Sequence, residues 1–161
     1  MSDRVEEITG VNVASESSLG MMHPTKVGTL LIHSDRILLL ESAHHEWCYP
    51  NGQIEQGESP WSCATREVYM ATRGIRLPNT CTSDIKFYQH LLSRVYAMRL
   101  SNDPRSYLDN AFARYDGSQY IGYTFVAIDT LRAYLKDKNT RQLRLREEDE
   151  AVLRVVLDNI L

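Results

Sequence analysis

The strongest local structural signals lie in residues 47–75, WCYPNGQIEQGESPWSCATREVYMATRGI. Ser59 is a suitable N-cap for a helix, and Pro60 suits the first helical position, where its missing N–H costs no hydrogen bond. The helix is expected to run to about Arg73, with Gly74 just past its end as a C-terminal stop. The stretch therefore predicts a tight loop followed by a well-delimited helix.

The loop before this helix carries glycines and charges that predict how it packs. Gly52 and Gly57 allow the backbone to approach another group closely. Arg66 lies on the helix where it is expected to pair with a carboxylate of the preceding loop, and Glu58 is the best candidate. This ion pair is expected to lock the loop to the helix.

Outside this stretch, apolar and β-branched runs separated by turn residues predict strands and two further helices. The expected strands are 26–33, 37–40, 85–90, 94–100 and 122–128, and the expected helices are 130–136 and 147–161. The polar residues 101–119 are expected to form a long loop. Strands, helix, strands and helix in this order predict a mixed sheet with helices packed on it. Residues 1–25 are expected to form an N-terminal arm ahead of one domain at 26–161.

Length and composition exclude several classes of protein. The chain has 161 residues, enough for one domain with a real core. Hydrophobic residues make up 43% and the net charge is -3, which excludes wholesale disorder and gives no general attraction to nucleic acid or anionic membranes. Cys48, Cys63 and Cys81 form no CxxC pair, which argues against zinc and for free thiols.

The sequence shows no membrane or export signal. No apolar run approaches the roughly 20 residues that span a bilayer. The first residues, MSDRVEE, are polar and acidic, and no apolar segment follows a positive start, as a secretory signal requires. We therefore expect an intracellular, cytoplasmic protein without a membrane partner.

Residues 47–75 resemble the Nudix box of the Nudix hydrolase superfamily. That pattern is a glycine, five residues, a glutamate, seven residues, Arg-Glu, an aliphatic residue, one residue, Glu-Glu, one residue, and a glycine followed by an aliphatic residue. Five residues fall in register with it: Gly52, Glu58, Arg66, Glu67 and Val68. The resemblance implies an α/β fold, the Nudix α/β/α sandwich with a mixed β-sheet, over residues 26–161.

The sequence departs from the box at its metal-binding glutamate pair. Met70 and Ala71 stand where the family has Glu-Glu, and Gly74 comes one residue late. In the family, the pair and the earlier glutamate hold Mg²⁺ or Mn²⁺, which neutralises a diphosphate and activates the attacking water. A hard cation needs several oxygen ligands, so loss of the pair is expected to weaken metal binding and slow hydrolysis by orders of magnitude.

Two interpretations of the altered positions remain open. The preferred one is that Met70 and Ala71 are core packing that replaced a lost site. The other is that a carboxylate from elsewhere restores the site, and the candidates are Glu41, Glu46, Glu55, Asp103, Asp109 and Asp116. Asp116 is the candidate metal ligand beside Glu67, because relatives draw a late ligand from the loop before the corresponding strand.

The resemblance also implies roles for individual residues. The candidate catalytic residues are Glu67, Glu58 and Arg66, although Glu67 could equally be a helix glutamate paired with arginine. Gly52 either offers a backbone carbonyl to a metal or is a turn glycine, and Glu55 is a candidate ligand-binding residue.

Aromatic and basic side chains supply further candidates. Phe112, Tyr115, Tyr120 and Tyr123 surround the expected long loop and either stack on a nucleobase or pack in the core. Tyr123 is taken as the ligand-binding candidate among them. The cluster Arg141, Arg144 and Arg146 either contacts phosphates or is offset by the acidic residues that follow it.

The first functional prediction is a Nudix-like protein with a degenerate box. It binds a nucleoside-diphosphate-type ligand or a partner and hydrolyses poorly or not at all. The alternative is an active hydrolase that uses Mg²⁺ or Mn²⁺ to cleave a nucleoside diphosphate linked to another moiety, with water attacking phosphorus. A third class is a structural or RNA-associated subunit of an assembly. A protein partner or a homodimer is compatible with each, whereas the acidic balance counts weakly against broad RNA binding.

Overall fold

The computed structural model describes residues 6–9, 23–113, 119–137 and 143–160. Its centre is an eight-stranded sheet in the order β1-β6-β7-β2-β3-β4, with β5 paired to β2 and β8 paired to β3. The strands are β1 (Glu6–Thr9), β2 (Lys26–His33), β3 (Arg36–Ser42), β4 (Trp47–Cys48), β5 (Asn51–Gln53), β6 (Lys86–His90), β7 (Ser93–Arg99) and β8 (Tyr120–Ala127). The sheet is mixed, because β2 and β7 run parallel whereas the other pairs are antiparallel.

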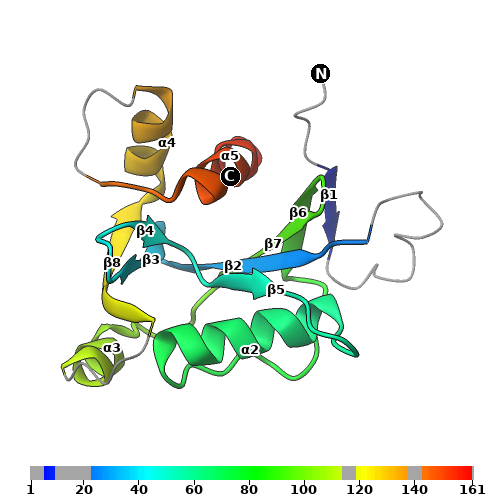
Figure 1. Cartoon of the computed structure of the whole chain (residues 1–161), viewed down its shortest axis with the longest axis horizontal. Helices are drawn as coiled ribbons and strands as arrows, with labels where there is room; N and C mark the ends of the chain where they lie inside the picture. The colour runs from blue at the N-terminus through cyan, green and yellow to red at the C-terminus, as the bar shows by residue number, and fades with distance from the viewer. Residues whose placement is uncertain (1–5, 10–22, 114–118, 138–142, 161) are drawn as a thin grey trace.

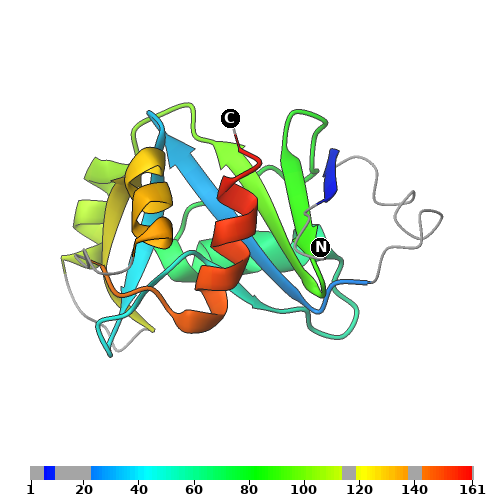
Figure 2. The same ribbon diagram turned by 90° about the horizontal axis from the view of Figure 1, so that it is seen from above.

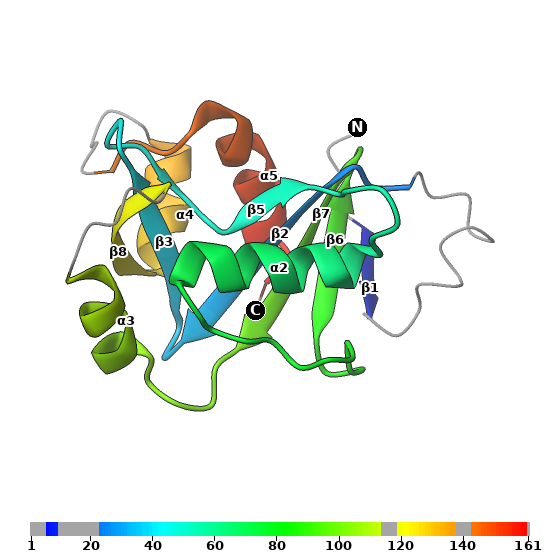
Figure 3. The ribbon, with the colours of Figure 1, turned by 60° about the horizontal axis from the view of Figure 1, so that its bottom comes forward.

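Helices cover both faces of this sheet, as Figure 1 shows. The helices are α2 (Pro60–Thr72), α3 (Arg105–Phe112), α4 (Ile128–Lys136) and α5 (Glu147–Leu157). Helices α4 and α5 lie on one face, and Figure 2 shows α5 crossing the strands on that side. Helix α2 runs across the opposite face beside β5, with α3 at the end of that layer (Figure 3). The predicted α/β/α sandwich with a mixed sheet is confirmed.

The two faces of the sheet bury separate apolar clusters, because side chains alternate along a strand. On β2, Leu30 and Ile32 point into the core under α4 and α5. Val27 and Leu31 of the same strand point into the core under α2. The six central residues of β2 are buried, in agreement with the β-branched and apolar content that predicted this strand from the sequence.

The polar segment 101–119 is not only a loop. Residues Arg105–Phe112 form α3, so the prediction of a continuous loop there is wrong. The helix buries Leu108 alone among its residues, so no apolar stripe marks it, and its N-cap residue is Pro104, which has no side-chain acceptor.

Strand β1 lies within the expected N-terminal arm and pairs antiparallel with β6. Four residues without alternating polarity give no strand signal, so the sequence did not predict it. Among the described residues, the helices are all too short or too polar to cross a lipid bilayer.

Candidate functional site

The start of α2 is held by the contacts that the sequence predicts. The N–H of Ser62 donates to the Ser59 hydroxyl at 3.1 Å, and Pro60 occupies the first turn. Arg66 Nε donates to Glu58 Oε2 at 2.6 Å, while its Nη2 donates to Glu58 Oε1 at 3.0 Å. These hydrogen bonds lower the pKa of Glu58 below its ordinary value. The predicted Glu58–Arg66 pair is confirmed, and it ties the loop to the helix.

Arg66 also binds Glu67, the box glutamate that follows it in the sequence. Its Nη1 donates to Glu67 Oε2 at 2.6 Å, and its Nη2 donates to the Gln53 carbonyl at 3.0 Å. Glu55 lies at the outer edge, 3.8 Å from Arg66 Nη1, with its side chain largely exposed. A single guanidinium therefore joins two carboxylates of the box to the end of β5.

Glu67 packs against Gly52, which explains the glycine. A Cβ atom at position 52 would overlap the Glu67 carboxylate. Gly52 lies in the middle of β5, opposite Val27, and so it is not a turn residue. The Glu67 side chain is 17% exposed, and its burial raises its pKa, which the neighbouring Arg66 opposes. Gly52 thus supplies the space in which the carboxylate meets the strand.

The two altered box positions have different environments. Met70 is 63% exposed, so its interpretation as core packing is wrong. Ala71 is 5% exposed and belongs to a buried cluster with Leu40, Cys48 and Tyr120, so the same interpretation is confirmed there. The helix face beside Glu67 therefore offers a methyl group and a thioether, neither of which binds a hard cation.

The residues that the structure describes do not assemble a site for a divalent metal. Within the described ranges, no three His, Cys, Asp or Glu side chains gather closely enough to hold a metal ion. Of the candidate compensating carboxylates, Glu55 lies at the edge of the box beside Arg66. The other described candidates are engaged elsewhere: Glu41 with His45, Glu46 with Arg144, Asp103 with Arg105, and Asp109 with Tyr123. Asp116, like Arg141 and Tyr115, lies outside the described residues.

Tyr123 faces α3. Its hydroxyl donates to Asp109, the Arg105 carbonyl oxygen lies 3.3 Å from the same hydroxyl, and the ring centre lies 5.8 Å from that of Phe112. The hydrogen bond to Asp109 and burial raise the pKa of Tyr123 to about 12, with burial the larger cause. These contacts favour a role in holding α3 against β8 over one in ligand stacking.

A second polar cluster at the start of α5 was missed in the sequence. Asp149 is fully buried and accepts from Arg146 Nε at 2.9 Å, with Lys26 Nζ and Asn51 Nδ2 each 3.5 Å away. Burial raises the pKa of Asp149, and the two cations oppose that shift. Asp149 therefore ties α5 to β2 and β5, and Arg146 is held by Asp149 and by Asn51 Oδ1 at 3.3 Å, which disfavours the interpretation that Arg146 contacts phosphate.

Arg73 occupies the place of the box glycine. The family pattern puts its glycine seven residues after the arginine, which is position 73 here, and Arg73 has the left-handed backbone (φ 61°) that glycine tolerates best. Its guanidinium donates to the carbonyls of Ala111 at 2.6 Å and Tyr120 at 2.9 Å, and lies 4.4 Å from the Phe112 ring centre. Arg73 therefore joins α2 to α3 and β8. The spacing of the box is the sequence signal that singles out position 73, because the family pattern has a glycine there.

We expect Arg73→Ala to destabilise the fold more than Arg73→Gly. Both variants lose the two hydrogen bonds and the ring contact, but glycine also relieves the left-handed backbone, which costs a residue with a Cβ about 1 kcal/mol. Urea denaturation of the three proteins measures the difference in free energy of unfolding. Equal stabilities of the two variants would contradict the strain at this position.

Comparison with known proteins identifies the family and the fold. The sequence matches the family model of the NUDIX domain over residues 22–152. It is similar in structure to a NUDIX hydrolase from Nitrosomonas europaea, with 19% identity, a TM-score of 0.51, and 86% of this chain and 90% of that chain covered. An ADP-ribose pyrophosphatase from Streptococcus suis gives 12% identity, a TM-score of 0.53, and coverage of 82% and 86%.

A third similar structure is a bifunctional NMN adenylyltransferase/ADP ribose pyrophosphatase from Francisella tularensis, complexed with AMP and a Mn ion. It gives 17% identity and a TM-score of 0.53, with 86% of this chain and 42% of that chain covered. No curated protein matches the sequence significantly. At these identities the structural likeness shows a shared fold, whereas the domain match covers most of the sequence. The chain belongs to the Nudix family.

Proposed function

We propose that this Nudix domain binds a nucleoside-diphosphate-type ligand and hydrolyses it weakly or not at all. The observation that carries the proposal is the helix face after Arg66, where Met70 is exposed to solvent and Ala71 is buried among apolar side chains. Glu67 alone keeps a carboxylate on this face, and Arg66 already binds it. Mg²⁺ and Mn²⁺ take several oxygen ligands, so a single neutralised carboxylate is a poor site for either ion.

The ligand class is supported by the family and by two of the similar structures. One of these proteins is named an ADP-ribose pyrophosphatase, and another is complexed with AMP and a Mn ion. Those names concern the other proteins. For this chain we propose the same chemical class of ligand, because the α2 helix, the loop that precedes it and the strand beside Glu67 are retained.

The proposal predicts binding without turnover. We expect ADP-ribose, UDP-glucose and dinucleoside polyphosphates to give no product above background with Mg²⁺ or Mn²⁺, while at least one of them raises the melting temperature. Phosphate release or chromatographic separation of products measures turnover, and differential scanning fluorimetry measures the melting temperature.

Metal-dependent turnover that falls at least about 100-fold in Glu67→Gln would overturn the proposal in favour of an active hydrolase. A parallel loss in Asp116→Asn would then identify the missing ligand. A protein that neither turns over nor is stabilised by any of these ligands would contradict the binding half of the proposal.

A further inference from the structure

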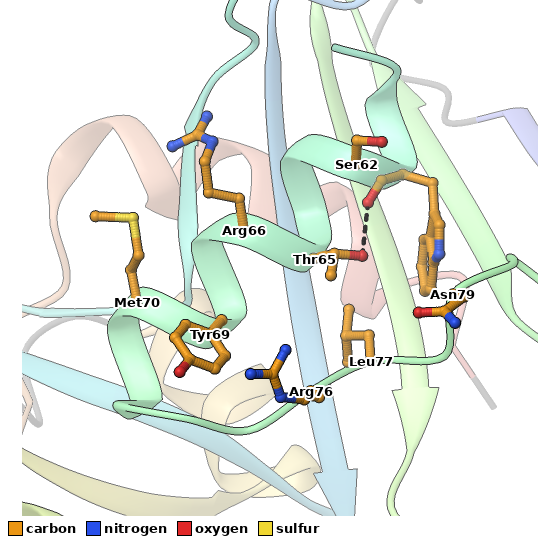
Figure 4. Close-up of a pocket in the computed structure, with 9 residues that line it drawn as sticks. Ser62, Thr65, Arg66, Tyr69, Met70, Arg76, Leu77 and Asn79 are labelled. Atoms are coloured by element: carbon orange, nitrogen blue, oxygen red, sulfur yellow. Dashed lines mark hydrogen bonds between the residues drawn. The ribbon is translucent and has the colours of Figure 1, made fainter.

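The outer side of α2 carries a groove that no part of the box explains. It encloses about 580 Å³ between the helix and residues 76–79, and we call it the α2 groove. The side chains that form its wall are Trp61, Thr65, Tyr69, Arg76, Leu77 and Asn79. Figure 4 shows Tyr69, Arg76, Leu77 and Asn79 on one side of α2, with Arg66 and Met70 projecting away from them at the opposite edge of the lining. A volume of this size is typical of a small-molecule site.

Arg76 gives this groove an unneutralised positive charge. Its guanidinium carbon lies 4.7 Å from the Tyr69 ring centre, and within the described part of the chain it has no carboxylate or hydrogen-bond partner. The described residues that line the groove include no acidic side chain, although the whole chain has a net charge of -3. Arg66, the other lining cation, is already bound by Glu58 and Glu67. A single free guanidinium thus sets the charge of the groove.

Neutral groups beside Arg76 can recognise a planar polar ring. Tyr69 is 40% exposed, so part of its ring is open to stacking. The Asn79 side-chain amide is exposed and, among the described residues, has no hydrogen-bond partner, which leaves donors and an acceptor free. Trp61 is held in the wall by a hydrogen bond from its indole N–H to the Pro78 carbonyl at 3.0 Å. The groove therefore has a rigid apolar base with a cation, an aromatic ring and an amide at its rim.

We propose that the α2 groove binds a nucleotide unit, with its phosphate on Arg76 and its base against Tyr69. Arginine binds phosphate through paired hydrogen bonds, and bases stack on exposed aromatic rings. Asn79 lines the same groove and offers its amide to the ligand. The inference rests on the proposed function and deepens it, because it places the nucleotide on the side of α2 away from Glu67. A free nucleotide and the terminal nucleotide of a single-stranded RNA share this chemistry.

The test is a fluorescence titration, since Trp61 lines the groove and its emission should change when the groove fills. The probes are AMP, adenosine, inorganic phosphate and a short 5′-phosphorylated oligoadenylate. We expect AMP to bind more tightly than adenosine or phosphate, and Arg76→Gln and Tyr69→Ser each to weaken AMP binding about tenfold. The matched control is Arg99→Gln, which removes an exposed arginine whose partner is Asp35. Circular dichroism checks that each variant is folded.

Each result decides the proposal. AMP binding that weakens in Arg76→Gln and persists in Arg99→Gln supports it, and tighter binding of the oligoadenylate than of AMP assigns the site to an RNA end. Equal weakening in both arginine variants overturns it, as does adenosine binding as tightly as AMP. If Arg76→Gln binds normally while Glu67→Gln does not, the nucleotide lies at the box, so the groove fails and the proposed function stands. If wild-type protein binds no probe, the groove proposal fails, and the proposed function is still decided separately by turnover and by the melting temperature with ADP-ribose, UDP-glucose and dinucleoside polyphosphates.

Discussion

Replacing Ala71 by glutamate is expected to lower the free energy of unfolding by about 3 kcal/mol, because it puts a carboxylate into an apolar cluster. Ala71 is packed with Leu40, Cys48 and Tyr120. Within the described residues no free cation lies in that cluster, so the new side chain must either displace α2 or become protonated. For a domain of this length the loss corresponds to a melting temperature lower by about 6–12 °C.

Met70→Glu is the matched control, since it makes the same kind of change at the adjacent residue. Met70 is 63% exposed, so its replacement should change the free energy of unfolding by no more than about 0.5 kcal/mol. Guanidinium denaturation of both variants measures the contrast. If Ala71→Glu proved as stable as Met70→Glu, the buried environment of position 71 would be disproved. The same contrast explains why restoring both glutamates together is not a simple route back to a metal site.

Removing the Arg66 guanidinium is the second change with a large expected effect. Arg66→Met should destabilise the fold by about 3 kcal/mol, because two partly buried carboxylates and a strand carbonyl lose their partner together. The groups left unpaired are those of Glu58, Glu67 and Gln53. Arg99→Met is the control: it breaks an exposed pair with Asp35, whose loss should cost less than about 1 kcal/mol.

The loss of stability expected in Arg66→Met should depend on pH in a defined direction. The lowered pKa of Glu58 means that its ion pair stabilises the fold above the ordinary glutamate pKa and that this stability is lost as the pH falls through the lowered value. The raised pKa of Glu67 has the opposite sign, because ionising it costs stability as the pH rises. The gap in the free energy of unfolding between wild type and Arg66→Met should therefore narrow as the pH falls below the ordinary glutamate pKa, about 4.3, through the lowered pKa of Glu58. A gap that widens on acidification would contradict this assignment.

Local signals determined what the sequence could predict. The Ser59 cap and the proline after it marked the start of α2, and the β-branched and apolar content of residues 26–33 marked a strand. The Glu58–Arg66 pair was also predictable, because the box spacing brings those two side chains together. These features depend on residues that are near one another in the chain or on a pattern that fixes their distance.

Tertiary contacts determined the features that the sequence could not predict. Met70 and Ala71 are adjacent in sequence, yet only the packing of α2 against β3, β4 and β8 shows that one is exposed and the other is buried. Asp149 reaches Lys26 across 123 positions of sequence, so no local pattern could pair them. Arg76 and Tyr69 were unremarkable as single residues, and they form a site only because the chain turns back along the helix after Gly74.

Arg73 has a consequence for the history of the chain. Its guanidinium bonds to the carbonyls of Ala111 and Tyr120, so exchanging it for the glycine of the box would loosen α3 and β8 before any catalytic group was regained. Ala71 imposes a similar barrier two residues earlier. Since each single exchange is expected to destabilise the fold, these two positions act as an evolutionary ratchet against acquiring the residues of the family pattern one at a time.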